Sequence, residues 1–505
     1  MIAKPPKSSA RTQPVKVPRP RALRLSPAQM YARILASDAS CNGDFFTGVL
    51  STGIYCLPSC RARKPKLENV RFFPDCESAR AAGLRACRKC HPDDFERGAD
   101  PMLESIETLV AEVRSTPEAF ADARAIVTRS GFGATRLFEL FRQHYHATPA
   151  DLLLRARIEI ARHKLLTTNS SLSIIAYEVG FESLSVFHEN FRRLNGLTPK
   201  AYRSLGSGNS FEVMLPEGYP LGYLRRALGR DIHSVTERLE DDTYTAGVRL
   251  GDNPAMLTLR LTPKSVKASL GLDAANPAIL PAAHAIIIGL LGLEQDAKAF
   301  ARLAKKLGLA RLIAGRPELR ISQTHSVFDG LLWSITGQQI NFPFACLLRN
   351  RLVQLAGTPL KAPEGKGLFA PPTPAAVAAL SPSDLLPLQF SGQKARYIID
   401  TARLVASGEL DLNALRAMSA TRAARTLLSV RGLGPWSVNY LMMRALGFAD
   451  CLPLGDTGVT SGLQSLFQLE ERPDIDATRR LMAVFSPHRS LATAHLWQLN
   501  QPTPD

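Results

Sequence analysis

The sequence contains no apolar run long enough to cross a membrane, and the run Ala285–Leu293 is too short for this. Acidic residues are absent from residues 1–26, which carry seven Lys/Arg and several prolines but no apolar core of a signal peptide. These residues predict a disordered basic arm, which either contacts DNA or only keeps the protein soluble. We therefore expect no membrane partner.

Acidic residues are also the minority of the charged residues in the whole chain. The 45 Asp/Glu stand against 62 Lys/Arg, which gives a net charge of +17 and a pI of about 9.7. Such an excess of positive charge favours a polyanionic partner, and nucleic acid is the expected one. A length of 505 residues with 45% hydrophobic residues predicts three or more domains with sizeable cores.

Cysteine is scarce outside one segment: six of the eight cysteines lie between Cys41 and Cys90. No secretory segment accompanies them, which argues against a disulfide framework and in favour of metal binding. Four of them form two close pairs, and four thiolates in two pairs suit one tetrahedral Zn²⁺. The predicted ligands are Cys56, Cys60, Cys87 and Cys90. The alternative is four unlinked, reduced cysteines.

The remaining cysteines predict no chemistry of their own. Cys41 and Cys76 are expected to be small buried hydrophobic residues. Cys346 and Cys451 stand alone, without the Pro-Cys-His-Arg pattern of an alkylguanine methyltransferase.

The residues around the paired cysteines indicate a family more specifically than the cysteine spacing does. The segments Thr52–Arg63, Asn69–Phe73 and Ala82–Asp93 closely resemble the zinc domain of the Ada methylation-response regulators, over about residues 27–98. The resemblance implies that Cys56 accepts a methyl group from a methylated DNA phosphotriester. Zinc would keep the thiol as a nucleophilic thiolate. The alternative is a structural zinc site without methyl transfer.

Methylation of Cys56 would also change the charge of the site. Zinc with four thiolates carries 2 − 4 = −2, and methylation of one sulfur leaves −1. Repulsion from DNA phosphates would weaken, so we expect methylation to tighten DNA binding and to act as a transcriptional switch.

Residues 104–204 predict helices that contain an internal repeat with an offset of 50 residues. Each copy predicts a helix-turn-helix. The matched residues are Leu137, Phe141, Thr148 and Pro149 in the first copy, and Phe187, Phe191, Thr198 and Pro199 in the second.

The second copy of the repeat, Ile175–Arg193 with Gly196–Pro199, resembles the AraC-type transcription factors. Four residues would lie early in the two recognition helices and contact DNA, namely Thr135, Arg136, Ser185 and His188. The alternative is a helical linker whose helix-turn-helix no longer recognises specific DNA sequences.

A linker, Ser204–Ser210, separates this region from a different pattern. The alternating stretches Tyr244–Leu250 and Met256–Leu261 predict strands. Helices dominate again from about Pro277, with His325–Ser334 and Gly392–Ser407 among them.

A Gly-x-Gly turn, Gly432 and Gly434, lies between the predicted helices Ala423–Ser429 and Pro435–Ala445. This is the pattern of a helix-hairpin-helix, whose free backbone N–H groups can bind a DNA phosphate. Asp456 lies 20 residues beyond Trp436 and is a candidate for chemistry at that strand. The alternative for Asp456 is a helix cap before Thr457.

Residues 211–500 resemble the AlkA-type 3-methyladenine DNA glycosylases. Phe211–Pro216 and Thr236–Leu239 resemble the small β-rich domain of that family. The resemblance implies that Asp456 is the catalytic aspartate and that Gln339 inserts into the DNA stack. The implied base pocket is Trp436, Tyr440 and Trp497, while Trp333 is expected to pack in the core.

These residues fit removal of a base from DNA. The base must leave the helix, electron-rich rings favour a cationic alkylated base, and a carboxylate stabilises the oxocarbenium-like transition state. The last lysine of the chain is Lys394, so the hairpin lacks the amine of a Schiff-base lyase. We expect a monofunctional glycosylase without an iron–sulfur cluster.

The predicted fold is multidomain, mainly α with α+β parts. The expected domains are a basic arm (1–26), an Ada-like zinc methyl-acceptor domain (27–98), an AraC-type double helix-turn-helix (104–204), an AlkA-like N-terminal α/β domain (211–276) and an all-α helix-hairpin-helix glycosylase domain (277–500).

The expected function is repair of alkylated double-stranded DNA, by excision of 3-methyladenine-type bases and by methyl transfer, with activation of transcription. RNA polymerase at promoters is an expected partner. The resemblances imply a cytoplasmic, bacterial-type, nucleoid-associated protein. The alternative is a DNA-binding transcription regulator with a catalytically silent glycosylase domain.

Overall fold

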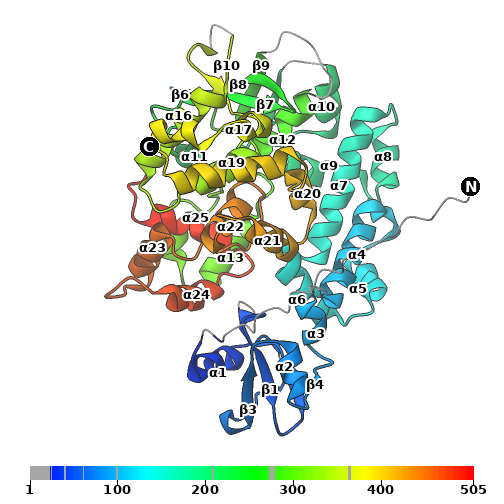
Figure 1. Ribbon diagram of the computed structural model, residues 1–505. Coiled ribbons are helices and arrows are strands. Elements are labelled where there is room, and N and C mark those ends of the chain that lie inside the picture. Colours follow the sequence, from blue (N-terminus) through cyan, green and yellow to red (C-terminus); the bar gives the residue numbers. More distant parts are fainter. Residues whose placement is uncertain are drawn as a thin grey trace, which may run out of the picture. The chain divides into compact units, whose positions relative to one another are not determined.

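The protein is described by a computed structural model (Figure 1), which covers residue 23 and residues 25–38, 41–60, 62–97, 100–207, 210–271, 279–361 and 365–504. The chain divides into two compact units, residues 1–105 and 106–505. Most of the predicted basic arm, residues 1–22 and 24, lies outside the described residues. Among the described residues, no helix is both long enough and apolar enough to cross a bilayer.

The first unit is built on a four-stranded sheet of order β3-β1-β2-β4. β1 pairs antiparallel with β2 and β3, whereas β2 and β4 run parallel. The elements are α1 (Pro27–Leu35), β1 (Phe46–Val49), β2 (Ile54–Cys56), β3 (Val70–Phe73), α2 (Cys76–Ala81), β4 (Arg85–Ala86) and α3 (Pro92–Glu96).

Local sequence explains where the helices of this unit begin. Ser26 and Gln29 form a capping box, and Pro27 occupies the first helical position of α1. Cys41 and Cys76 are buried, at 7% and 0% exposure, as predicted for small hydrophobic residues.

The second unit begins with a helical region that contains two structurally matched repeats. Its helices are α4 (Pro101–Ser115, which starts in the first unit), α5 (Ala123–Ser130), α6 (Ala134–Tyr145), α7 (Pro149–Thr167), α8 (Leu172–Glu178), α9 (Leu184–Asn195) and α10 (Pro199–Arg203). The 50-residue repeat has a physical cause. Thr148 and Thr198 are both N-caps followed by proline. The repeated apolar residues Leu137, Phe141, Phe187 and Phe191 are all fully buried.

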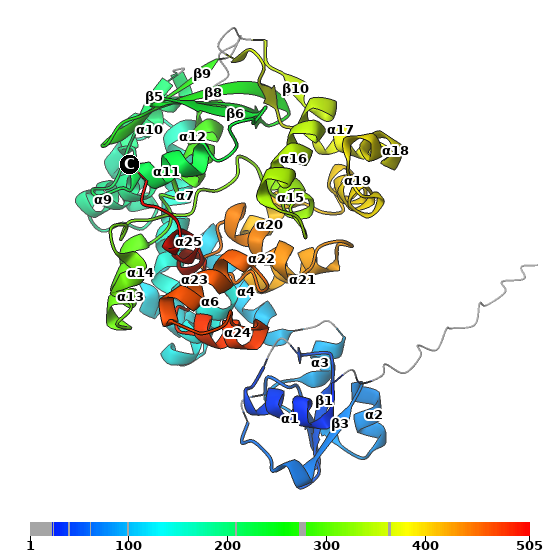
Figure 2. The same cartoon turned by 90° about the vertical axis from the view of Figure 1, so that its left-hand side faces the viewer.

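A five-stranded antiparallel sheet of order β5-β9-β8-β7-β6 follows. Its strands are β5 (Ser210–Met214), β6 (Glu237–Glu240), β7 (Thr243–Leu250), β8 (Asn253–Leu261) and β9 (Ser265–Gly271), which confirms the two predicted strands. Helices α11 (Leu221–Leu228) and α12 (Ile279–Leu291) pack against this sheet (Figure 2).

The rest of the chain is helical apart from the short hairpin of β10 (Thr358–Pro359) and β11 (Phe369–Ala370). One hydrophobic core joins its helices. They are α13 (Ala297–Lys306), α14 (Ala310–Ile313), α15 (Val327–Thr336), α16 (Phe342–Ala356), α17 (Pro374–Ala378), α18 (Pro382–Leu385), α19 (Gly392–Ala406), α20 (Leu412–Ala417), α21 (Ala420–Ser429), α22 (Pro435–Arg444), α23 (Thr457–Phe467), α24 (Ile475–Ala483) and α25 (Arg489–Leu499).

The predicted linker after residue 203 differs from expectation. Ser204–Ser207 is a turn of 3₁₀ helix, and Leu205 is only 2% exposed. Leu205 belongs to one hydrophobic cluster that includes residues of α7–α10, of the five-stranded sheet and of α12. The repeat region and the sheet are therefore packed together, rather than joined by an extended tether.

Candidate functional site

The four paired cysteines gather at the ends of two parallel strands. Cys56 is the last residue of β2, and Cys87 follows β4, with its N–H bonded to the Tyr55 carbonyl at 3.0 Å. Each pair is closed by a tight turn, as in Cys60, whose N–H donates to the Leu57 carbonyl at 3.0 Å. The parallel pairing of β2 with β4 thus brings Cys56 and Cys60 next to Cys87 and Cys90.

The geometry of this cluster fits a tetrahedral metal. The four sulfur atoms lie within 4.8 Å of one another, and Cys56, Cys60 and Cys87 are buried. The N–H of Leu57 donates to Cys90 Sγ at 3.3 Å, and the N–H of Lys89 donates to Cys87 Sγ at 3.4 Å. Backbone N–H groups directed at sulfur stabilise thiolates, so these residues bind one Zn²⁺.

Asp456, the predicted catalytic acid, occupies a helix-cap position. It is the N-cap of α23, and its Oδ1 accepts from the Val459 N–H at 3.0 Å. The indole N–H of Trp497 donates to the same oxygen at 2.9 Å, and that of Trp436 donates to Oδ2 at 3.2 Å. The cap and the two indoles fix both carboxylate oxygens beside an aromatic cluster.

The predicted pocket aromatics do lie together. Trp436 and Tyr440 stack with ring centroids 5.2 Å apart, and Tyr440 lies 6.3 Å from Trp497. Trp333 packs against the core as predicted, but its indole N–H also donates to the Tyr440 hydroxyl at 3.0 Å. Trp333 therefore holds Tyr440 of the predicted pocket, a contact that the sequence did not reveal.

The predicted hairpin lies between α21 and α22, as expected, although α21 begins three residues earlier than predicted. Gly432 has φ +97°, a left-handed conformation that favours glycine. Gln338 braces the turn, because its Nε2 donates to the Gly432 carbonyl and to Ser437 Oγ, both at 2.8 Å. Sequence reasoning singled out Gln339 and gave no role to Gln338.

Gln339 lies at the exposed tip of the turn between α15 and α16. Its backbone has φ +56°, and its side chain is exposed. The location is accessible to DNA, whereas Gln338 beside it points inward to the hairpin.

The four predicted recognition residues are not equivalent. Thr135 and Arg136 lie exposed in the first turn of α6, and Ser185 lies exposed in the first turn of α9. His188 is half-buried, its ring 5.7 Å from that of Phe187. His188 thus contributes to packing, while the other three face outward.

Lys394, the last lysine, lies on α19. Its Nζ donates to the Thr336 carbonyl at 2.7 Å, and burial lowers the pKa of this amine. The amine is thus held at the C-terminal end of α15.

Three families match successive parts of the chain. Residues 29–93 match the metal binding domain of Ada, residues 126–204 match a helix-turn-helix domain, and residues 332–487 match the HhH-GPD superfamily of base excision DNA repair proteins.

Individual relatives match the whole chain or its halves. A probable bifunctional transcriptional activator/DNA repair enzyme AlkA from Mycobacterium tuberculosis is 27% identical over 92% of this chain and 95% of its own length. The Bacillus subtilis DNA-3-methyladenine glycosylase is 33% identical over 41% of this chain and 68% of its own length. The Bacillus subtilis bifunctional transcriptional activator/DNA repair enzyme AdaA is 32% identical over 35% of this chain and 82% of its own length.

Proposed function

Because the chain belongs to the HhH-GPD superfamily of base excision DNA repair proteins and, in its N-terminal half, to the Ada-type activator and repair enzymes, we propose that it excises alkylated bases of the 3-methyladenine type from DNA. In the same proposal its zinc-bound Cys56 accepts methyl groups from DNA phosphotriesters, and its helix-turn-helix pair activates the alkylation response. The same proposal divides the chain into a zinc methyl-acceptor domain (27–98), a double helix-turn-helix (104–204), a small α/β domain (211–276) and a glycosylase domain (277–500).

The observation that carries the glycosylase function is the carboxylate of Asp456, held by two indole N–H groups beside stacked rings. A flipped, cationic base would lie against Trp436 and Tyr440. The C1′–N bond breaks and the base leaves with the electron pair, while Asp456 stabilises the positive charge on the sugar. Water then bonds to C1′ and releases a proton.

Asp456→Asn tests this role. Asparagine is also a favoured N-cap, so α23 stays capped, but the negative charge is lost. We expect release of 3-methyladenine from alkylated DNA to fall by a factor on the order of 1000, as for loss of a major electrostatic contact in other active sites. DNA binding, measured by fluorescence anisotropy, should persist.

The test separates the enzyme from a silent, DNA-binding glycosylase domain. Wild-type protein that binds alkylated DNA without releasing any base would support the silent domain. Borohydride should trap no covalent protein–DNA adduct, because the hairpin and the chain beyond it contain no lysine.

Methyl transfer would use the sulfur of Cys56 as nucleophile. The S–CH₃ bond forms as the O–CH₃ bond of the phosphotriester breaks, and the phosphodiester leaves as an anion. Bound zinc would keep the thiol of Cys56 deprotonated, as the nucleophilic thiolate, at neutral pH. The other three cysteines hold the site around it.

Mass spectrometry of Cys56 peptides after incubation with methylphosphotriester DNA tests this step. We expect one added methyl group per chain on Cys56, and none in Cys56→Ser. Cys41→Ser, a buried cysteine outside the cluster, is the control and should still be methylated. Unmodified Cys56 in wild-type protein that retains its zinc would show a purely structural site.

A further inference from the structure

A cavity of about 100 Å³ lies beside the proposed base pocket, between the α11–β6 segment and the helices that carry the aromatic cluster. Tyr440 belongs to both, since it stacks on Trp436 and also lines the cavity. The other lining residues used below are Arg230, Trp333, Phe342, Arg349 and Arg444.

The aromatic wall continues from the base pocket into this cavity. The indole N–H of Trp333 donates a hydrogen bond to the Tyr440 hydroxyl. The rings of Trp333 and Phe342 lie edge-to-face, with centroids 5.7 Å apart. Phe342 is the first residue of α16, just after the exposed turn of Gln339. A base that is displaced from DNA near this turn would therefore meet a continuous aromatic surface.

Helix α22 places the guanidinium group of Arg444 beside the same surface. Trp436, Tyr440 and Arg444 are spaced four residues apart, so they lie one above the other on one face of the helix. Arg444 also lines the cavity, and its Nε is buried without a hydrogen-bond partner among the described residues.

A second cation approaches from the opposite wall. The guanidinium carbon of Arg230 lies 4.0 Å from the centroid of Phe342. In the described part of the chain, no hydrogen bond or ion pair reaches the side chain of Arg230. Its donors are therefore available to a ligand in the cavity.

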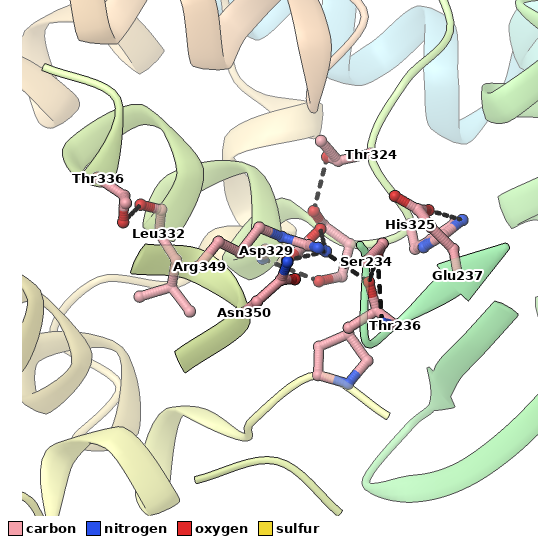
Figure 3. A network of polar contacts seen from close by, with 12 residues as sticks. Ser234, Thr236, Glu237, Thr324, His325, Asp329, Leu332, Thr336, Arg349 and Asn350 are labelled. Carbon is pink, nitrogen blue, oxygen red and sulfur yellow. Dashed lines mark hydrogen bonds and ion pairs between the residues drawn. The ribbon is translucent and has the colours of Figure 1, made fainter. Parts of the chain in front are cut away.

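The segment that carries Arg230 is fixed in place by contacts with α16. Asn350 of α16 donates to Asp231 Oδ2 and to the His233 carbonyl, both at 3.0 Å. Arg349 donates to Thr236 Oγ1 at 2.8 Å and is paired with Asp329 at 3.1 Å (Figure 3). Arg349 is thus neutralised, whereas Arg230 and Arg444 keep unused donors.

We propose that this cavity contacts the edge of the flipped base, and that Arg230 and Arg444 favour alkylated guanine as a second substrate beside 3-methyladenine. The selection rests on the proposed glycosylase function. Guanine presents the O6 acceptor where adenine presents an amino group, and arginine donates to that acceptor but cannot pair with the amino group. Alkylated adenine gains no such hydrogen bond at this edge, so alkylated guanine is favoured relative to it.

DNA treated with dimethyl sulfate contains 7-methylguanine and 3-methyladenine together, so one substrate measures the selection. The readout is the ratio of the two initial release rates, with the bases separated by chromatography. We expect Arg230→Gln to lower the ratio of 7-methylguanine to 3-methyladenine about tenfold, because a hydrogen bond from a charged donor is lost. Arg444→Gln, on a different element, should shift the ratio in the same direction.

Arg260→Gln is the matched control, because Arg260 is an exposed arginine on β8 of the same sheet and outside the cavity. It should keep the wild-type ratio. An unchanged ratio in both Arg230→Gln and Arg444→Gln would overturn the inference and leave the glycosylase function intact. Wild-type protein that released neither base would overturn the proposed function itself.

Discussion

Asp456 combines a helix cap with the proposed role of active-site acid. The same Oδ1 accepts from the Val459 N–H of α23 and from the indole of Trp497. Local stability and chemistry therefore depend on one rotamer. The two interpretations that the sequence offered for Asp456 are compatible, since a cap needs one oxygen and the carboxylate has two.

Gly458→Ala should disturb the contact between Trp497 and Asp456 without replacing the acid. A Cβ at Gly458 would lie 2.6 Å from Trp497 Cδ1 and 3.2 Å from Asp456 Oδ1, so the indole must move. We expect base release to fall on the order of 100-fold, as for a displacement of about 1 Å in an active site. Gly392→Ala, whose Cβ meets nothing closer than 4.0 Å, is the control. Equal release rates in the two variants would contradict the role of the Trp497–Asp456 contact.

Sequence reasoning found the residues that belong to short motifs or to the family resemblance, and missed other residues that long-range packing brings in. Asp456, Trp436 and Tyr440 stand at recognisable spacings within 20 residues. Gln338 reaches Gly432 from 94 residues away, and Arg230 comes from the segment before β6. Neither carries a local signal, since an isolated glutamine or arginine in a sequence is usually a solvated surface residue.

At the scale of the element, we expect the two glycines of the hairpin to have different roles, Gly432 in folding and Gly434 in DNA contact. A Cβ at Gly432 would lie 2.4 Å from the ring of Tyr397, and φ is +97°; a Cβ at Gly434 meets nothing within 4 Å. We expect Gly432→Ala to lower the free energy of unfolding by about 1–3 kcal/mol. Gly434→Ala should cost less than about 1 kcal/mol, because only an N-cap preference changes.

The same pair of variants tests the phosphate contact. The open space at Gly434 is where a DNA backbone can approach, so Gly434→Ala should weaken binding of an abasic-site duplex about tenfold at near-normal stability. Urea denaturation and fluorescence anisotropy measure the two effects. Wild-type affinity in Gly434→Ala would mean that DNA does not approach the hairpin there.

Element boundaries were predictable where caps and prolines punctuate the chain. Pro435 begins α22 where expected, and the Thr-Pro repeats begin α7 and α10. The segment after residue 203 was not predictable, because its small and polar residues indicate a linker. Burial of Leu205 depends on the sheet that the following residues form.

At the scale of the molecule, the helix-turn-helix region and the glycosylase region of the second unit are joined by polar contacts as well as by a shared core. Arg422 Nε, on the helix before the hairpin, is paired with Glu107 of α4 at 2.8 Å. His144 Nδ1 lies 2.8 Å from Thr421 Oγ1. His284 of α12 donates from Nε2 to the carbonyl of Asn195 in α9 at 2.8 Å. We therefore expect residues 106–505 to unfold in one cooperative transition.

Two buried histidines predict how this unit responds to acid. His284 is 2% exposed and His495 is fully buried, and burial lowers their pKa to about 4 and about 3, respectively. The unfolded chain takes up protons at about pH 6.5, where the folded chain does not, so stability is full above that pH and is lost as pH falls toward 4. From pH 7.5 to pH 5 each histidine should remove about 2 kcal/mol from the free energy of unfolding.

Urea denaturation of wild-type protein and of His495→Gln at these two pH values separates this effect from packing. His495 Nδ1 donates to the Leu312 carbonyl at 3.1 Å, and its Nε2 is buried without a partner in the described residues, so the neutral ring is the form that fits. The variant should be less stable at pH 7.5, because its packing against Phe300 is altered, but should lose about 2 kcal/mol less than wild type on acidification. His163→Gln, on the exposed side of α7, is the matched control. If His495→Gln and wild type lost equal stability between the two pH values, protonation of His495 would not drive acid unfolding.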